Sequence, residues 1–222
     1  ILQTKFENMD EFKLVFNKMS LDGSLFDIGK LNFFAREILG KLTKKEITAR
    51  VKAYAEKYNT RLYNYLIQDE SRFEDIMNIE REKENPRKDY EKFANMLDII
   101  GFFFDDYYEG LLVNPLPFNE KFSKETIWDV LNEMKEKLSL DQDEQSWFAN
   151  MKEIAINAGF AGNNKEYKAN PDAFKGTVGD VAELLRITFT ARKNAPNLYY
   201  VMKILGKETC NKRIDRINSL LK

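Results

Sequence analysis

The chain has 222 residues, a formal net charge of −1 and 43% hydrophobic residues. This length and apolar content suit one large or two small folded domains and exclude a disordered chain. The chain has no histidine and a single cysteine, Cys210, so a histidine base, an internal disulfide and a cysteine-rich zinc site are excluded within it. An unpaired thiol, and the lack of any apolar run of about 20 residues, favour a cytoplasmic protein without membrane contact.

Helical spacing of apolar residues recurs along nearly the whole chain, and no segment shows the sustained alternation of a strand. The first pattern, over residues 25–38, predicts a helix that stops at Gly40. Thr43 and Glu46 stand three residues apart, as in a capping box, and they predict the start of the next helix.

Two further helices are expected before the middle of the chain. Ser71 and Glu74 have the spacing of a second capping box, and Pro86 must end or interrupt the helix that follows. Residues 89–108 are rich in Phe and Ile and predict one more helix.

The second half of the chain shows the same pattern of capped helices. Ser123 is a candidate N-cap, and Thr177 with Asp180 predicts another helix start. Pro196 suits the first position of a helix that ends at Gly206, and a basic last helix follows.

Residues 114–117 hold two prolines in four positions, a composition that predicts a linker between the two halves of the chain. We therefore predict an all-α fold of two helical subdomains, residues 1–116 and 117–222.

Charge is distributed unevenly along the chain. Residues 105–144 hold 11 acidic and 4 basic side chains, whereas residues 175–222 hold 10 basic and 4 acidic ones. A basic end beside an acidic middle indicates an oriented polyanionic partner. A solvated, lysine-rich helix face explains the same charges, and that alternative stays open.

Two local features are candidates for contact with nucleic acid. The charged segment 81–88 places the guanidinium groups of Arg81 and Arg87 at what we expect to be an exposed turn, where they can pair with phosphate or a base edge. A solubilising loop fits this segment equally well. Tyr199 and Tyr200 lie between a proline and a basic helix, which suits stacking on bases, whereas most other aromatic residues are expected in the core.

The most informative residues form a series in the last quarter of the chain. Lys175-Gly176-Thr177-Val178 is followed by Leu185-Arg186, by Pro196-Asn197-Leu198 and by Leu205-Gly206-Lys207-Glu208. Their order and spacing resemble the C-terminal anticodon-binding region of bacterial glutamyl-tRNA synthetases, where K-G-x-V precedes an L-R helix, an (S/T)-P-x-L turn and L-G-x-E. In this chain Ala195 replaces the hydroxyl residue of that turn, and Ala191 replaces the family's usual glycine. Residues 23–32 are similar to the family's G-A-L-F-D-x-x-K-L-N segment.

The resemblance implies an all-helical cage that docks on tRNA, with the first part against the inner side of the L-shaped molecule and the second around the anticodon loop. It nominates Arg87, within Asn-Pro-Arg-Lys-Asp, as the reader of the third anticodon base. It carries the family's other base contacts to Arg186, Pro196 and Leu198. Arg192, at the end of the stretch that resembles the family's L-R helix, is nominated with them.

The resemblance also implies a parent enzyme that uses ATP and Mg²⁺ to attach glutamate to tRNA. The family's ATP-binding His-Ile-Gly-His motif is absent because the chain has no histidine, so we expect the catalytic domain upstream of Ile1. The chain itself is expected to be a monomer with no catalytic residue, cofactor or metal, and to be inactive alone. Its expected partner is glutamate tRNA, with or without glutamine tRNA.

Two alternatives remain open at this stage. The chain can be the anticodon-binding module of another class I synthetase, such as the lysyl type. It can also be a helical protein–protein adaptor, for which its basic last quarter is incidental.

Overall fold

The computed structural model describes residues 26–222, and its regular structure in this range is helical. The α-helices are α1 (Ile28–Gly40), α2 (Lys44–Tyr58), α3 (Thr60–Gln68), α4 (Glu70–Asn78), α5 (Met96–Ile100), α6 (Asp105–Leu111), α7 (Lys124–Lys137), α8 (Glu144–Asn157), α9 (Asn164–Ala169), α10 (Val178–Thr190) and α11 (Leu198–Leu221), with 3-10 turns η3 (Phe93–Asn95), η4 (Gly101–Phe103) and η5 (Pro171–Ala173). The prediction of an all-α fold is confirmed. The expected helix start at Leu25 and the first residues of the 23–32 segment lie outside the described range.

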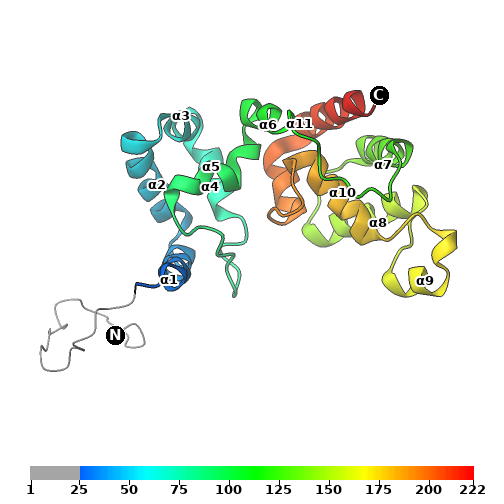
Figure 1. The fold of residues 1–222 in the computed structure, drawn as a ribbon, viewed down its shortest axis with the longest axis horizontal. Helices are drawn as coiled ribbons and strands as arrows, with labels where there is room; N and C mark the ends of the chain where they lie inside the picture. Colours follow the sequence, from blue (N-terminus) through cyan, green and yellow to red (C-terminus); the bar gives the residue numbers. More distant parts are fainter. Residues whose placement is uncertain (1–25) are drawn as a thin grey trace, which may run out of the picture.

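The helices gather into two groups along the chain. Figure 1 shows α1–α5 on one side and α7–α11 on the other, with α6 between them. α4 contacts α11, and η4 contacts α10, so the groups meet along α4, α6 and η4. The buried apolar side chains form one continuous cluster through both groups. No helix lies between α6 and α7, which is where residues 114–117 were expected to form a linker; the boundary between residues 1–116 and 117–222 remains a prediction.

Helix starts follow the sequence at Thr43, Ser123 and Thr177, but not at Ser71. Thr43 and Glu46 form the expected reciprocal pair at the start of α2, and Thr177 caps α10 in the same way. The box expected at Ser71 is wrong. α4 begins two residues earlier, because the side chain of Asp69 accepts a hydrogen bond from Arg72 N–H at 2.9 Å.

The single helix expected over residues 89–108 is also wrong, because η3, α5, η4 and α6 divide this stretch. One straight helix spreads three consecutive side chains around its axis, whereas the breaks leave Phe102, Phe103 and Phe104 all buried. Gly101 is required at the break, since a Cβ there would lie 2.5 Å from the ring of Tyr107.

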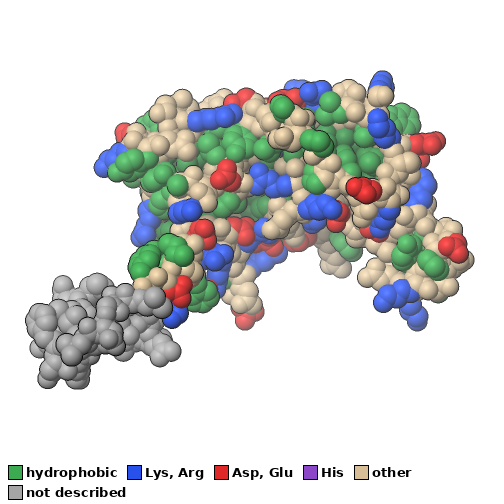
Figure 2. Space-filling model, in the orientation of Figure 1, with side chains coloured by type: hydrophobic (Ala, Val, Ile, Leu, Met, Phe, Trp, Pro, Cys, Tyr) green, Lys and Arg blue, Asp and Glu red, His purple; other side chains and the backbone are tan. Residues whose placement is uncertain are grey.

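α1 forms as its spacing predicts, but its apolar side chains are not buried by the rest of residues 26–222. Ile28, Leu31 and Ile38 are 60%, 50% and 58% exposed. Figure 2 shows apolar side chains gathered over α1. The spacing of these residues therefore determined the helix without determining what covers it.

α11 begins at Leu198 rather than at Pro196, with Asn197 as its N-cap. Gly206 interrupts it as expected, with φ 77° and ψ 159°, which are not helical values. Within residues 26–222, no helix is both long enough and apolar enough to span a bilayer.

A buried arginine joins α6, α10 and α11. Arg213 is 3% exposed, its Nη1 donates to the carbonyl of Phe189, and its Nη2 lies 3.1 Å from Asp105 Oδ1. Its guanidinium also lies 4.0 Å from the ring centre of Tyr108, whose hydroxyl donates to the carbonyl of Thr188. Burial lowers the pKa of Arg213 and raises that of the neighbouring Cys210 thiol to about 12.

Replacement of Arg213 tests this junction. We expect Arg213→Ala to lower the free energy of unfolding by about 2–4 kcal/mol, since it empties a buried site and leaves a carbonyl without its donor. Asp105→Ala should cost about 1 kcal/mol or less, because Asp105 is 73% exposed. Urea denaturation of both variants measures the difference; equal losses would show that the ion pair, rather than the buried contacts, carries the stability.

The end of α10 offers a second test. Ala191 has φ 57° and ψ 22°, a left-handed conformation that favours glycine. Ala191→Gly should raise the free energy of unfolding by about 0.5–1 kcal/mol. Ala182→Gly, inside the same helix, is the control and should lower it by about 1 kcal/mol. Loss of stability in both variants would contradict this explanation.

Candidate functional site

The structure brings Arg87 close to the start of α11, although the two are far apart in sequence. Arg87 lies in the loop that follows α4, and Glu80, in the same loop, connects it to α11. One carboxylate oxygen of Glu80 lies 3.6 Å from Arg87 Nη1 and accepts a hydrogen bond from the backbone N–H of Asn197 at 3.3 Å. A single carboxylate therefore holds together two segments that are 117 residues apart.

The contacts continue from Asn197 and return to Glu80. Asn197 Nδ2 donates to Glu144 Oε1 at 2.5 Å, and the hydroxyl of Tyr200 donates to Glu144 Oε2 at 3.0 Å. Lys83 Nζ lies 5.6 Å from the ring centre of Tyr200 and donates to Glu80 Oε1 at 3.1 Å. We name this set the Glu80 network; its members are Glu80, Lys83, Arg87, Glu144, Asn197 and Tyr200.

The network perturbs two of its own ionisable groups. The hydrogen bond from Tyr200 to Glu144 raises the pKa of the tyrosine, because ionised tyrosine cannot donate. The hydrogen bond of Lys83 to Glu80 raises the pKa of the lysine. Both side chains are therefore held in the protonated form at neutral pH, in which their donors remain available to the network.

Glu80 has an unusual backbone. Its φ is 56°, in the left-handed region that residues with a side chain rarely adopt. The carbonyl of Glu80 accepts a hydrogen bond from Arg87 N–H at 3.2 Å, which closes the loop on itself. A left-handed backbone costs free energy at a residue with a side chain, and the contacts of the network offset that cost.

Arg87 is held by acidic groups of its own loop. Its Nε donates to Asp89, its Nη1 faces Glu80, and its side chain is 27% exposed. An incoming base or phosphate must exchange for at least one of these carboxylates. Arg87 is thus positioned but not free, and its role as a base reader remains a prediction.

Arg81 does not lie at an exposed turn, so that expectation is wrong. It is 7% exposed and donates to the carbonyls of Leu39 and Leu42, at 2.7 and 2.9 Å, and of Met77. The last carbonyls of a helix have no partner within the helix, and Arg81 satisfies them where α1 ends. The guanidinium of Arg81 is therefore occupied by hydrogen bonds to the chain's own carbonyls.

The two other predicted arginines lie on the second group of helices. Arg192 Nη1 donates to the carbonyl of Asp98, and its guanidinium lies 5.3 Å from the ring centre of Phe102, so it connects the end of α10 to α5 and η4. Burial lowers its pKa. Arg186 is partly buried on α10, and its Nε has no hydrogen-bond partner among residues 26–222.

The side chains at the start of α11 are more enclosed than the sequence indicated. Pro196 and Leu198 are buried, so their side chains shape the turn from inside. Tyr199 is 4% exposed and donates to the carbonyl of Gln142 at 2.7 Å, whereas Tyr200 is partly exposed. Of the two tyrosines considered for stacking, only Tyr200 is accessible. The proposed RNA contacts of Arg186, Arg192, Pro196 and Leu198 remain predictions.

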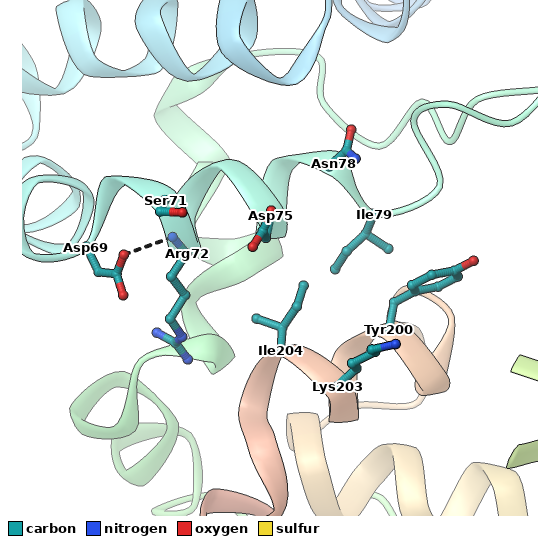
Figure 3. Close-up of a pocket in the computed structure, with 9 residues that line it drawn as sticks. All are labelled: Asp69, Ser71, Arg72, Asp75, Asn78, Ile79, Tyr200, Lys203 and Ile204. Atoms are coloured by element: carbon teal, nitrogen blue, oxygen red, sulfur yellow. Dashed lines mark hydrogen bonds between the residues drawn. The ribbon is translucent and has the colours of Figure 1, made fainter. Parts of the chain in front are cut away.

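A cleft of about 660 Å³ runs between α4 and α11 on one side of the network (Figure 3). Ile79 and Ile204 face each other from its two walls. Tyr200 and Lys203 line the α11 wall, and Asp75 lines the α4 wall. Tyr200 thus belongs to both the cleft and the Glu80 network.

Sequence reasoning did not identify Glu80, Glu144 or Asn197 as parts of one site. Asn197 carries a readable signal, because asparagine before an apolar helical run is a frequent N-cap. Glu80 and Glu144 are two glutamates among 36 acidic residues, and only the folded chain distinguishes them.

Comparison with known proteins identifies the family of the chain. A protein-family model described as "Anticodon binding domain" matches residues 46–218, a range that contains the whole Glu80 network. The chain belongs to the anticodon-binding domain family. The match includes both the loop that carries Arg87 and all but the last residues of α11.

Curated relatives agree with the family. The chain is 32% identical over 216 residues to the glutamate–tRNA ligase of Acetivibrio thermocellus, covering 97% of this chain and 39% of that protein. It is 31% identical over 207 residues to that of Clostridium beijerinckii, with 93% and 37% covered, and 30% identical over 204 residues to that of Clostridium perfringens, with 92% and 37% covered. The chain thus spans under two fifths of these relatives' length, and it corresponds to their anticodon-binding region.

Substitution of Glu80 tests the network. Glu80→Ala should lower the free energy of unfolding by about 1–2 kcal/mol, because it removes the acceptor for Asn197 N–H and keeps a side chain in left-handed backbone. Glu84→Ala, at an exposed position in the same loop, is the control and should change it by about 0.5 kcal/mol or less. Urea denaturation gives both values; indistinguishable variants would mean that Glu80 does not join the two segments.

Proposed function

We propose that this anticodon-binding domain binds the anticodon loop of glutamate tRNA, as part of a glutamate–tRNA ligase. The observation that supports this most directly is the Glu80 network, which holds Arg87 beside the start of α11. Two segments that the family resemblance nominates for base contact thereby face one region of the surface. The proposal includes a monomer whose two helical subdomains, divided near residue 116, form a cage around the loop.

The chemistry of these groups suits unpaired RNA bases. Loop bases are turned out of the helix and are read by arginine, by stacking and by backbone groups. Arg87 presents a guanidinium fork that pairs with a base edge or a phosphate. The N-terminus of α11 adds backbone N–H groups and a partial positive charge, which favour a nearby phosphate.

Exchange of carboxylates gives Arg87 a basis for selectivity. Its ion pairs with Asp89 and Glu80 are already made in the free protein. A base that pairs poorly with the guanidinium does not compensate for their loss, whereas a base that accepts two hydrogen bonds does. We infer that the two carboxylates suppress binding of wrong bases and of isolated phosphates.

Catalysis is assigned to the rest of the parent enzyme. ATP and Mg²⁺ would serve the activation of glutamate there. We assign no reaction step to this chain, because it corresponds to less than two fifths of the length of the ligases it matches. ATP–pyrophosphate exchange by the purified chain would contradict this assignment.

The range of tRNAs that the chain accepts is the main question, and a titration against glutamate, glutamine and lysine tRNA transcripts at two salt concentrations answers it. We expect binding to glutamate tRNA that weakens with salt. Equal binding to glutamine tRNA would indicate a relaxed reader, and preference for lysine tRNA would favour the lysyl-type alternative. A chain that binds none of them would favour the protein–protein adaptor.

Arg87 provides the decisive variant. Arg87→Ala should weaken binding of the cognate tRNA by about 1–3 kcal/mol if the guanidinium contacts a base. The loss of affinity should vanish on a tRNA with a changed third anticodon base, because that base does not form the hydrogen bonds with the guanidinium. Lys88→Ala is the control: Lys88 pairs with Glu37 at 2.7 Å and should affect both tRNAs equally. Equal losses with Arg87→Ala on both tRNAs would show that Arg87 contacts only the backbone.

A further inference from the structure

A second cavity lies beside the Glu80 network, between the start of α8 and the start of α11. Its volume is about 390 Å³, and it is lined by Glu144, Gln145, Trp147, Phe148 and Asn197. Asn197 and Glu144 also belong to the network, so the cavity shares a wall with it. None of its lining residues was among those that the sequence nominated.

Phe148 is the unusual member of this wall. It is 53% exposed, whereas the preceding residue, Trp147, is 5% exposed and packs 5.8 Å from the ring of Tyr199. Adjacent residues on a helix point in different directions, so α8 uses Trp147 for the core and leaves Phe148 at the surface. An accessible aromatic face at a concave site suits stacking with a planar ring, and the sequence-tolerant stacking of bases on aromatic side chains is a general feature of single-stranded RNA recognition.

The rim of the cavity supplies fixed polar groups. Asn197 is held by its bond to Glu144 and by its own cap of α11, in which its Oδ1 accepts from Tyr199 N–H at 3.0 Å. Both carboxylate oxygens of Glu144 already accept hydrogen bonds, so its charge is partly compensated. Gln145 is exposed and carries an amide that can both donate and accept. An aromatic wall with amide groups at its edge matches the face and the edge of a nucleobase.

We propose that this cavity binds one unpaired nucleobase of the RNA, with Phe148 as the stacking surface and the amides of Gln145 and Asn197 at the base edge. This inference rests on the proposed function, because the occupant is part of the same RNA. Asn197 contacts both parts, because its backbone N–H donates to Glu80, the partner of Arg87, and its side chain lines the cavity. The site therefore adds a second point of contact, on α8, to the region where α11 begins.

Affinity measurements on variants of Phe148 test the site. Phe148→Ala should weaken binding of glutamate tRNA about ten-fold or more, and Phe148→Leu should behave similarly because it keeps an apolar side chain but no ring. Phe148→Tyr should bind as the unchanged chain does. Ile67→Ala, at a 50% exposed apolar residue on α3, is the control for loss of surface apolar area and should have no effect.

Removal of single bases identifies the occupant. The same titrations are made with transcripts that carry one abasic nucleotide at each anticodon-loop position in turn. At one position, the missing base should weaken binding of the transcript to the unchanged chain. With that same transcript, Phe148→Ala should cause no further loss of affinity. If Phe148→Ala costs the same with every transcript, Phe148 does not stack on a loop base and the inference is overturned.

Fluorescence provides an independent readout. The chain has two tryptophans, so Trp128→Phe leaves Trp147, which lines the cavity, as the only one. A saturable change in its emission on addition of RNA, lost at the abasic position found above, supports a base in the cavity. Tight RNA binding with no effect of Phe148→Ala and no change at Trp147 overturns the site but leaves the proposed function intact. A chain that binds no RNA overturns both.

Discussion

The carboxylate of Glu80 is the contact on which the arrangement of the candidate site depends. It accepts the N–H of Asn197, 117 residues away in the sequence, and it holds Arg87 and Lys83 of its own loop. Its effect comes from position rather than from charge alone, because exposed ion pairs contribute little individually. Glu80 makes these contacts from a backbone with φ 56°, in the left-handed region.

Two arginines of similar appearance in the sequence have different roles for a simple physical reason. Arg81 follows the end of α4 near the unsatisfied carbonyls at the end of α1, and its guanidinium is used by three of the chain's own carbonyls. Arg87 meets carboxylates instead, in a partly exposed position. A carbonyl contact buried in the fold is not exchanged for a ligand, whereas a partly exposed ion pair can be. The groups packed around each arginine, not the residue type, decide whether its guanidinium can be exchanged for a ligand.

The junction between the two groups of helices combines buried and accessible parts. Arg213 and Tyr108 fill its interior, and the Glu80 network and the α4–α11 cleft lie at its surface. The break in α11 at Gly206 separates the segment that lines the α4–α11 cleft from the segment that carries Arg213. A rigid interior beside a set of exchangeable polar contacts is a suitable arrangement for binding a flexible loop of RNA.

The sequence by itself determined most helices, two capping boxes and the break at Gly206, because these depend on residues three or four positions apart. It also carried the family resemblance, since short segments at fixed spacing survive at about 30% identity. It did not determine the breaks around Gly101, the burial of Arg81, the exposure of α1 or the meeting of Glu80 with Asn197. Those outcomes depend on groups far apart in the chain. Phe102, Phe103 and Phe104 are all buried in a core that distant helices help to form, and the carboxylate of Glu80 accepts from a donor 117 residues away. Only the tertiary structure brings such groups together.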